Sequence, residues 1–576
     1  MNLGRRSAVA AAAVTAALLL PAAASAHAYL VKTVPAASVT VNASPATVEL
    51  TFDEAVEPRF ALISVTDVSA RSQTSGSLHR AAANPDTLVV PLKTLPEGWY
   101  LVYWRAISVD GHPVQGAFTF AVGPNAGPAP QFTVPHISRT ATTTPLLLTR
   151  WAVFLTVMSA IGLFVLRMLI AQPLVRRVEQ TSLRTLSRAV VAASLLGLIA
   201  LPAYLEESTA VDSLRSFWAF GALVPLWRTT AFGRGYVKME LCFALFCIAA
   251  WVALWVDRPR EEQRTIAALL ALAGAVLAAA AVLVFPGVAG HAAQTSPRAL
   301  TVSLDWLHLV CGSVWLGGLL GMLVLWRSLS PERRVAGLAV AVPRFSNVAF
   351  VSVLLLLGTG IGETIVHLPV LAALWQTSYG KVILIKIGIL AATLPLAGLN
   401  LLRTKPGLVA AGGQATLGAR PARLLRRLVG GEAALIAGAV FAAVLLSSLA
   451  PPPPAFAQQE SAQAHVGPGR VARTLSRGGY TLQLLVSPNR AAAPNSFALS
   501  VSRHGRPVRN AEVTVQFAML DMEMPNQEYR LQETRPGVYS RRAPALVMVG
   551  HWGLDFTITP NNGTPFTALV VDHATG

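Results

Sequence analysis

Eight long apolar stretches constrain this chain more than any other feature of its sequence. A run of about 20 apolar residues can cross the hydrocarbon core of a bilayer as a helix. Only 13% of the 576 residues are charged, and we predict a polytopic α-helical membrane bundle of about eight spans over residues 146–450. The stretch 214–227 is aromatic but short and interrupted, so we expect it to be interfacial or re-entrant. The predicted spans are 146–171, 188–205, 236–256, 265–286, 300–326, 345–367, 380–402 and 432–450.

Basic residues are concentrated in the connections between the apolar stretches, and the formal net charge is +18. The connections predicted on one side of the membrane hold 17 Lys and Arg residues, against 6 on the other side. Because short cytoplasmic loops are enriched in these residues, we expect both chain termini on the opposite, outer side. The charge thus orients helices in a lipid bilayer, and no nucleic-acid binding is expected. The predicted inner connections are 172–188, 257–264, 327–344 and 403–430, and the outer ones are 206–238, 286–299 and 368–381.

The first 26 residues have the pattern of a signal peptide. Basic residues come first, an apolar run follows, and the small-residue pattern Ala24-Ser25-Ala26 ends the segment. This order is typical of secretory signals, although an uncleaved anchor helix is the alternative. Cleavage after Ala26 would make His27 the first residue of the mature protein. Together with the spans, the signal predicts a multi-pass protein of a bacterial cytoplasmic (inner) membrane, with its N- and C-terminal domains on the periplasmic side.

Two segments outside the predicted bundle alternate short β-type runs with Pro and Gly residues. Such runs indicate small all-β folds, so we expect a sandwich or barrel over 27–123 and an Ig-like β-sandwich over 479–576. We interpret 124–145 and 451–478 as linkers. All three cysteines lie in the apolar stretches, so neither β domain is expected to contain a disulfide.

The most specific set of metal ligands joins His27 to Asp110 and His112. A free N-terminal histidine can chelate a metal ion through its α-amine and its ring Nδ1. Asp110 and His112 are two residues apart, so on an extended segment they project from one face. Two imidazoles, an amine and a carboxylate form a nitrogen and oxygen set that suits tetragonal Cu(II). The alternative is that Asp110-Gly111-His112 is only a polar turn before the next strand.

Three segments around these ligands form a recognisable set: His27-Ala28-Tyr29-Leu30, Pro35-Ala36 and Val109-Asp110-Gly111-His112-Pro113-Val114-Gln115-Gly116-Ala117-Phe118-Thr119-Phe120. They resemble the periplasmic copper-resistance family CopC. The resemblance implies a Greek-key β-barrel that binds Cu(II) through the N-terminal amine, His27, Asp110 and His112. Some members also carry a methionine-rich Cu(I) loop. We do not expect that loop here, because no methionine lies between Met1 and Met158.

Several residues that can bind a metal ion lie inside the predicted spans or next to them. Ionisable groups are costly in a bilayer, so they face the bundle interior and mark pathways. Their spacing places several of them on common helix faces. We therefore expect a copper pathway toward the outer side of the membrane, with polar helix packing as the alternative. The residues are His291, Asp305, His308, Cys311, Glu363 and His367.

The same region contains Gly290-His291, Asp305-Trp306-Leu307-His308, Val314-Trp315-Leu316-Gly317-Gly318-Leu319, Arg344-Phe345-Ser346, Ser378-Tyr379-Gly380-Lys381 and Lys386. These motifs resemble the CopD family, with which CopC domains are often fused. The two resemblances together cover most of residues 27–450. They imply a membrane protein that handles copper.

The C-terminal β segment contains a methionine cluster, Met519, Met522 and Met524, and His551 lies further along the chain. Thioethers are soft ligands that suit Cu(I). The arrangement resembles the YtkA-like domain. We predict that any metal preference in this domain is for Cu(I), with packing of the methionines as the alternative.

The combined prediction is a protein that captures Cu(II) outside the membrane and transports copper through the bundle, contributing to copper homeostasis or resistance. Uptake is the favoured direction, because the chain has no nucleotide-binding or phosphorylation motif to drive export. The expected partners are the copper ion, the lipid bilayer and other envelope copper carriers, and no enzymatic activity is expected. One alternative is a haem- or copper-containing membrane redox protein, since paired histidines in a bundle can ligate haem. Another is an oxidative enzyme built on the His27 chelate.

Overall fold

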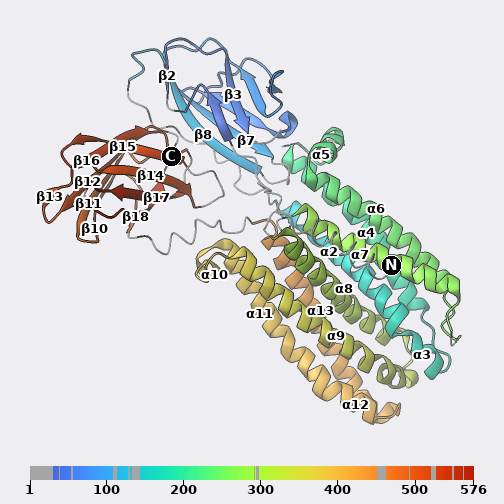
Figure 1. The fold of residues 1–576 in the computed structure, drawn as a ribbon. Coiled ribbons are helices and arrows are strands. Elements are labelled where there is room, and N and C mark those ends of the chain that lie inside the picture. Colours follow the sequence, from blue (N-terminus) through green and yellow to red (C-terminus); the bar gives the residue numbers. More distant parts are fainter. Residues whose placement is uncertain are drawn as a thin grey trace, which may run out of the picture.

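The structure is a computed structural model with two β domains and a helical bundle between them (Figure 1). Both β domains lie at the same end of the bundle (Figure 1). This end, where α4, α9 and α13 terminate, is called the domain end, and the opposite end is called the loop end. The residues that the structure describes are 30–37, 39–52, 56–107, 113–127, 130, 132, 143–213, 215–218, 220–261, 263–290, 292, 297–449, 462, 464–491, 493–520, 527–547, 550–561 and 563–575.

The N-terminal domain is a sandwich of two four-stranded sheets, ordered β1-β3-β6-β5 and β2-β8-β7-β4. Alternate residues of β3 point inward, and Val48, Leu50 and Phe52 are almost completely buried. This period-two burial is what a half-buried strand requires, and it confirms the predicted all-β domain. The elements are β1 Leu30–Val34, β2 Thr40–Val41, β3 Thr47–Phe52, η1 Pro58–Phe60, β4 Leu62–Thr66, β5 His79–Arg80, β6 Thr87–Pro91, β7 Gly98–Ile107 and β8 Pro113–Val122.

In the described part of the chain, eight helical segments are long and apolar enough to cross a membrane, which confirms the predicted number. The segment 214–227, expected to be interfacial, contains η3 and most of the short helix α5. Two of the long segments contain π-helical turns, η2 and η5. The elements are α2 Thr144–Val165, η2 Leu166–Ile170, α3 Gln172–Arg177, α4 Arg184–Asp212, η3 Phe220–Ala222, α5 Leu223–Thr229, α6 Ala231–Val256, α7 Ile266–Ala289, α8 Arg298–Ser328, α9 Pro331–His367, α10 Ala373–Gln376, α11 Ser378–Leu399, η5 Asn400–Thr404, α12 Lys405–Ala410 and α13 Ala415–Leu446.

Helices α2 and α8 approach each other closely through two glycines. A Cβ atom at Gly162 would lie 1.9 Å from the carbonyl oxygen of Ser313, and one at Gly317 would lie 2.4 Å from Cα of Gly162. Small residues let membrane helices pack backbone against backbone. The contact fixes α8, which carries Asp305 and His308, against the first span.

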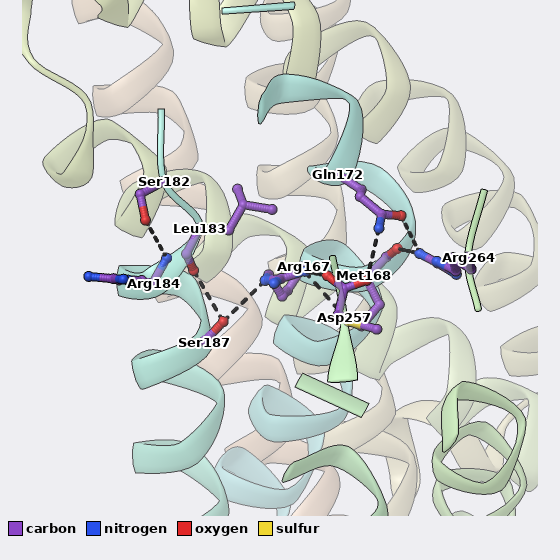
Figure 2. A network of polar contacts seen from close by, with 9 residues as sticks. All are labelled: Arg167, Met168, Gln172, Ser182, Leu183, Arg184, Ser187, Asp257 and Arg264. Atoms are coloured by element: carbon purple, nitrogen blue, oxygen red, sulfur yellow. Dashed lines mark hydrogen bonds and ion pairs between the residues drawn. The ribbon is translucent and has the colours of Figure 1, made fainter. Parts of the chain in front are cut away.

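A buried polar network holds the loop end together (Figure 2). Arg167 in η2 forms an ion pair of 2.8 Å with Asp257, whose side chain is fully buried. Gln172 donates to the other carboxylate oxygen of Asp257 at 2.9 Å, Arg167 Nε donates to Ser187 at 3.1 Å, and Arg264 donates to Gln172. Removing one partner of a buried pair leaves an uncompensated charge and typically costs about 3–5 kcal/mol. The network therefore ties the first span to α4 and to the α6–α7 connection.

The C-terminal domain is one continuous path of strands that curls around a single core, in the order β10-β11-β12-β16-β15-β14-β17-β18-β9. The two halves of the expected sandwich are joined through the β15–β16 pair, so the sheet is nearly closed. The elements are β9 Ala464–Val466, β10 Val471–Arg477, β11 Tyr480–Ser487, β12 Asn495–Arg503, β13 Arg506–Pro507, β14 Glu512–Met519, β15 Gln527–Arg535, β16 Val538–Ala543, β17 Gly550–Thr559 and β18 Phe566–Ala574.

The expected linker 451–478 is too long at its C-terminal end. Strands β9 and β10 lie inside it, and they pair with β18 and β11. Val471 and Leu475 of β10 are buried in the domain core. The sequence between the two strands contains Gly467-Pro468 and Gly469, and this turn composition hid their strand character.

Asp572 in β18 is fully buried in the C-terminal core. The amide Nδ2 of Asn489 donates to its Oδ1 at 2.8 Å. Burial raises the pKa of Asp572 from 3.8 to about 6, and the Asn489 hydrogen bond opposes this shift. The folded domain therefore disfavours the ionised carboxylate, whereas the unfolded chain ionises at the lower, ordinary pKa.

This difference predicts that the C-terminal domain loses stability as the pH rises from about 4 through about 6. A pKa raised by about 2 units corresponds to a loss of up to about 3 kcal/mol. Urea unfolding of residues 462–575 at several pH values measures the effect. In the variant Asp572→Asn most of this pH-dependent loss of stability should disappear. The control variant Glu512→Gln, at an exposed position, should lose stability with pH as the unmodified domain does. A pH-independent stability of the unmodified domain would contradict the prediction.

Candidate functional site

The predicted Cu(II) ligands of the N-terminal domain, His27, Asp110 and His112, lie outside the described residues. The described chain gives the positions of the two residues that flank the second pair. Ile107 at the end of β7 is paired with Pro113 at the start of β8. Asp110 and His112 therefore belong to the short connection that leaves one strand and enters the other at this point.

The ends of this connection lie against the helical bundle. Arg105 of β7 is 5% exposed, and its Nη1 donates to the backbone oxygen of Asp212, the last residue of α4, at 3.3 Å. Ile107 and Phe60 are buried in the same apolar cluster as Tyr236 of α6. An arginine that is nearly buried requires acceptors for its donors, and the end of α4 supplies one. The N-terminal domain is thus packed onto the domain end of the bundle.

A cavity of about 530 Å³ brings together four of the six predicted pathway residues, Asp305, His308, Glu363 and His367. They come from α8 and α9. Cys311 is buried on α8 but does not line this cavity, and His291 lies outside the described residues. Further polar groups around the cavity are Arg150, Tyr204, Ser208, Asp212, Tyr236, Tyr379 and Lys386.

The ring of His308 is oriented by a hydrogen bond across two helices. Its Nδ1 lies 2.9 Å from the hydroxyl of Thr359, which itself donates to the backbone oxygen of Leu355 at 2.8 Å. When the hydroxyl proton is used in that bond, Nδ1 of His308 is the donor and Nε2 keeps its lone pair. His367 has the same tautomer, since its Nδ1 lies 2.8 Å from the carbonyl oxygen of Glu363, which can only accept. Metal-binding histidines are commonly held in this way.

The two acidic side chains of the cavity are closely confined. A Cβ atom at Gly287 of α7 would lie 2.7 Å from Oδ2 of Asp305, so a residue larger than glycine would displace this carboxylate. Oε1 of Glu363 is buried, and no described residue hydrogen-bonds to it. Buried carboxylate oxygens without a donor favour the approach of a cation. Among the described residues no three His, Cys, Asp or Glu side chains converge on one point. The cavity therefore offers individual ligands at separate positions and not a preformed metal site.

Sequence reasoning missed several residues of the cavity. Arg150 of α2 donates toward the backbone oxygen of Ser447 at 3.5 Å, and it was overlooked because it lies near the end of a span. Tyr379 and Lys386 occur in the CopD-like motifs, but the sequence did not place them beside His308. Thr359 gave no signal, because its role depends on a contact between α8 and α9. Polarity within spans could have identified the first three.

The predicted Cu(I) ligands of the C-terminal domain do not share one face. Met519 is 4% exposed and packs in the domain core, and its strand partner is Trp552. His551 is adjacent to Trp552 and therefore projects from the opposite face, where it stacks on His573 at a ring distance of 4.7 Å. Met519 and His551 thus cannot contribute to one site in this fold. Met522 and Met524 lie outside the described residues.

Three family matches follow one another along the chain. Residues 30–123 match the CopC domain, residues 339–446 match copper resistance protein D, CopD, and residues 476–557 match the YtkA-like family. Through its N-terminal domain the chain belongs to the CopC family. The CopD match contains Glu363, His367 and Lys386, whereas Asp305 and His308 precede it.

The chain has relatives along its whole length and along the CopC domain. Copper transport protein CutJ of Bacillus subtilis is 26% identical over 544 residues, which is 93% of both chains. Copper resistance protein C of Pseudomonas syringae pv. tomato is 36% identical over 113 residues, which is 19% of this chain and 89% of that protein. The crystal structure of CopC from Methylosinus trichosporium OB3b is 34% identical and covers 18% of this chain and 100% of that chain, with a TM-score of 0.16. The CopC domain, the match to CopD and the eight long apolar helices together indicate a membrane protein that handles copper.

The hydrogen bond between His308 and Thr359 predicts the effect of Thr359→Val. Without the hydroxyl the imidazole loses the partner that fixes its tautomer and orientation, so copper affinity of the cavity should fall about 10–100-fold. This affinity is measured by competition titration of detergent-solubilised protein that carries His112→Ala, a change that removes a predicted ligand of the outer site. Thr364→Val is the matched control, because Thr364 lines the same cavity and its hydroxyl donates to the backbone oxygen of Gly360 in its own helix. Equal affinity in the two variants would contradict the role given to Thr359.

Proposed function

We propose that this protein takes up copper: the CopC domain captures Cu(II) on the outer side through His27, Asp110 and His112 and passes it into the membrane cavity. The observation that carries this proposal is the position of Asp212. Its backbone oxygen accepts the hydrogen bond from Arg105 of the CopC domain, and the same residue lines the cavity that contains His308. The described end of β7, which leads into the connection that carries Asp110 and His112, therefore contacts a residue of the cavity wall.

The chemistry of the cavity is consistent with transfer between ligands of the same kind. His27, His112 and Asp110 offer nitrogen and oxygen donors, and the cavity offers imidazole from His308 and His367 with two carboxylates. A copper ion that moves between similar donors is never released to bulk water. Because the cavity ligands do not form a closed cage, each binds weakly enough to release the ion again.

The direction and sidedness of transport rest on two physical arguments. The excess of Lys and Arg in the predicted inner connections puts the loop end in the cytoplasm and both β domains outside. The membrane potential then draws a cation inward by about 2.3 kcal/mol per charge per 100 mV, so uptake needs no nucleotide. The whole-length similarity to a protein described as a copper transport protein supports transport over catalysis.

The test of the proposed pathway is copper uptake by cells with and without the protein, followed by mass spectrometry of cell copper. We expect His308→Ala to abolish the protein-dependent uptake while Cu(II) binding by the CopC domain persists. Uptake is normalised to folded protein in the membrane, because loss of a packing residue would lower abundance as well. Normal uptake per folded His308→Ala molecule would exclude an essential role for this residue. A visible spectrum without haem absorption would exclude the haem alternative.

Delivery from the CopC domain is tested by Arg105→Ala. The arginine is not one of the proposed copper ligands, but it docks β7, which leads into their loop, on the bundle. The variant should therefore bind Cu(II) normally and take up copper about tenfold more slowly, a change of about 1.4 kcal/mol. A variant with one residue added before His27 is the complementary control, because it displaces the α-amine and should lose binding as well as uptake. Unchanged uptake in Arg105→Ala would show that docking does not limit delivery.

A further inference from the structure

The wall of the cavity that α13 provides continues toward the loop end and ends in a carboxyl group. Val444, Val440 and Ile436 line the cavity at intervals of four residues. Glu432 is the next residue of the same stripe, one helical turn or about 6 Å further along the axis. It is 3% exposed.

Helix α11 provides the matching polar group on the opposite wall. Thr393 lines the cavity, and Asn400 lies two turns further toward the loop end on the same helix face. The amide Nδ2 of Asn400 donates to Oε1 of Glu432. Between the two levels Leu396 packs against Gly431, where an added Cβ would be 3.6 Å away. The side chain of Leu396 thus lies on α11 between the level of Thr393 and that of Asn400.

A π-helical turn holds Asn400 in place. Segment η5 begins at Asn400, and Thr404 at its end is fully buried. The hydroxyl of Thr404 lies 2.7 Å from the backbone oxygen of Asn400 and 3.0 Å from its Oδ1. Such turns are rare, and they recur at functional sites, because the extra residue redirects side chains and backbone oxygens. Here the π turn directs an amide group toward the carboxyl of the facing helix.

Glu432 differs from a carboxylate that only fastens two helices. Its hydrogen-bond partner is a neutral amide, and within the described residues no Lys, Arg or His forms an ion pair with it. A buried carboxyl group in a membrane span is costly and by default marks a pathway. Beyond it the chain reaches the loop end quickly, since Lys405 follows Thr404 and donates to Asn347 at 2.9 Å in an exposed hydrogen bond.

We propose that Glu432 is the inner copper-binding station of the membrane pathway, where copper rests after it leaves the cavity and before it reaches the loop end. The proposal rests on the proposed transport function and extends its path beyond the four cavity residues. The ligand at hand is the Glu432 carboxylate, because Asn400 turns Nδ2 toward it and Oδ1 toward Thr404. Rotation of the amide would add its oxygen as a second ligand, and such a weak oxygen site favours Cu(II) over Cu(I). Weak binding suits a transit site, because the ion must also leave.

The test compares Glu432→Gln with Glu206→Gln in the full-length protein. Both glutamates are buried in long helices and neither lines the cavity, but Glu206 lies in α4 near the domain end, whereas Glu432 lies beside Asn400 toward the loop end, so Glu206 controls for the loss of a buried carboxyl group as such. Copper uptake per folded molecule should fall at least about tenfold in Glu432→Gln, equivalent to about 1.4 kcal/mol, and stay normal in Glu206→Gln. Thermal unfolding in detergent should be the same for both variants if the loss arises from transport and not from folding.

A second measurement does not depend on transport. Infrared difference spectra of the purified protein in lipid, before and after addition of Cu(II), detect carboxyl groups that respond to the metal. A difference band present in the unmodified protein and in Glu206→Gln should be missing in Glu432→Gln. Identical spectra in all three proteins, or equal uptake by Glu432→Gln and the unmodified protein, would overturn the proposal. Failure of the unmodified protein to take up copper would instead refute the proposed transport function, and the spectra would still decide whether Glu432 binds copper.

Discussion

The cost of leaving a polar group in hydrocarbon determines how this structure is organised. Each charged or hydrogen-bonding side chain in a span must find a partner, face a cavity or hold an ion. The bundle meets this requirement in two different ways. At the loop end Arg167 and Asp257 neutralise each other in a network that also satisfies Gln172 and Ser187 (Figure 2). At the domain end Asp305, His308 and Glu363 surround a cavity without a closed set of partners. The first arrangement stabilises the bundle, and the second leaves room for a cation.

The same argument extends across the boundary between the CopC domain and the bundle. Arg105 lies on the outer face of the β2-β8-β7-β4 sheet, on the opposite side from the domain's own core residues Trp104 and Ala106. A nearly buried arginine on such a face requires a covering surface with acceptors, and the end of α4 provides it. Because Ile107 then enters the apolar cluster of the bundle, the start of the loop that carries Asp110 and His112 is fixed by the packing of both units. A freely tethered CopC domain would lack this constraint.

Hydropathy and period-two patterns predicted the fold well, because burial in lipid and in small β cores leaves strong local signals. The eight helical segments and both β domains agree with the sequence prediction, whereas β9 and β10 were assigned to a linker because glycine and proline interrupt them. For the site, Asp305, His308, Glu363 and His367 could be predicted since polar residues stand out in apolar spans. Their grouping around one cavity, the hydrogen bond between His308 and Thr359, and the exclusion of Cys311 all depend on helix rotation and interhelical distance. Single-sequence periodicity does not contain those quantities. Likewise, the methionine cluster did not reveal that Met519 packs in the core.

The two π turns show how similar local geometry can serve stability in one place and transport in another. Both η2 and η5 precede a short helix with proline in its first turn, and both direct a polar side chain toward a neighbouring element. Arg167 from η2 meets a carboxylate, so the charges cancel and the low dielectric strengthens the pair. Asn400 from η5 meets a carboxyl group without cancelling its charge. Only the Asn400–Glu432 pair would be stabilised by a cation, because copper would supply the positive charge that the neutral amide lacks. The position of Glu432 one turn beyond the cavity then follows the same physical logic as the cavity itself, with a cation completing what the protein leaves unpaired.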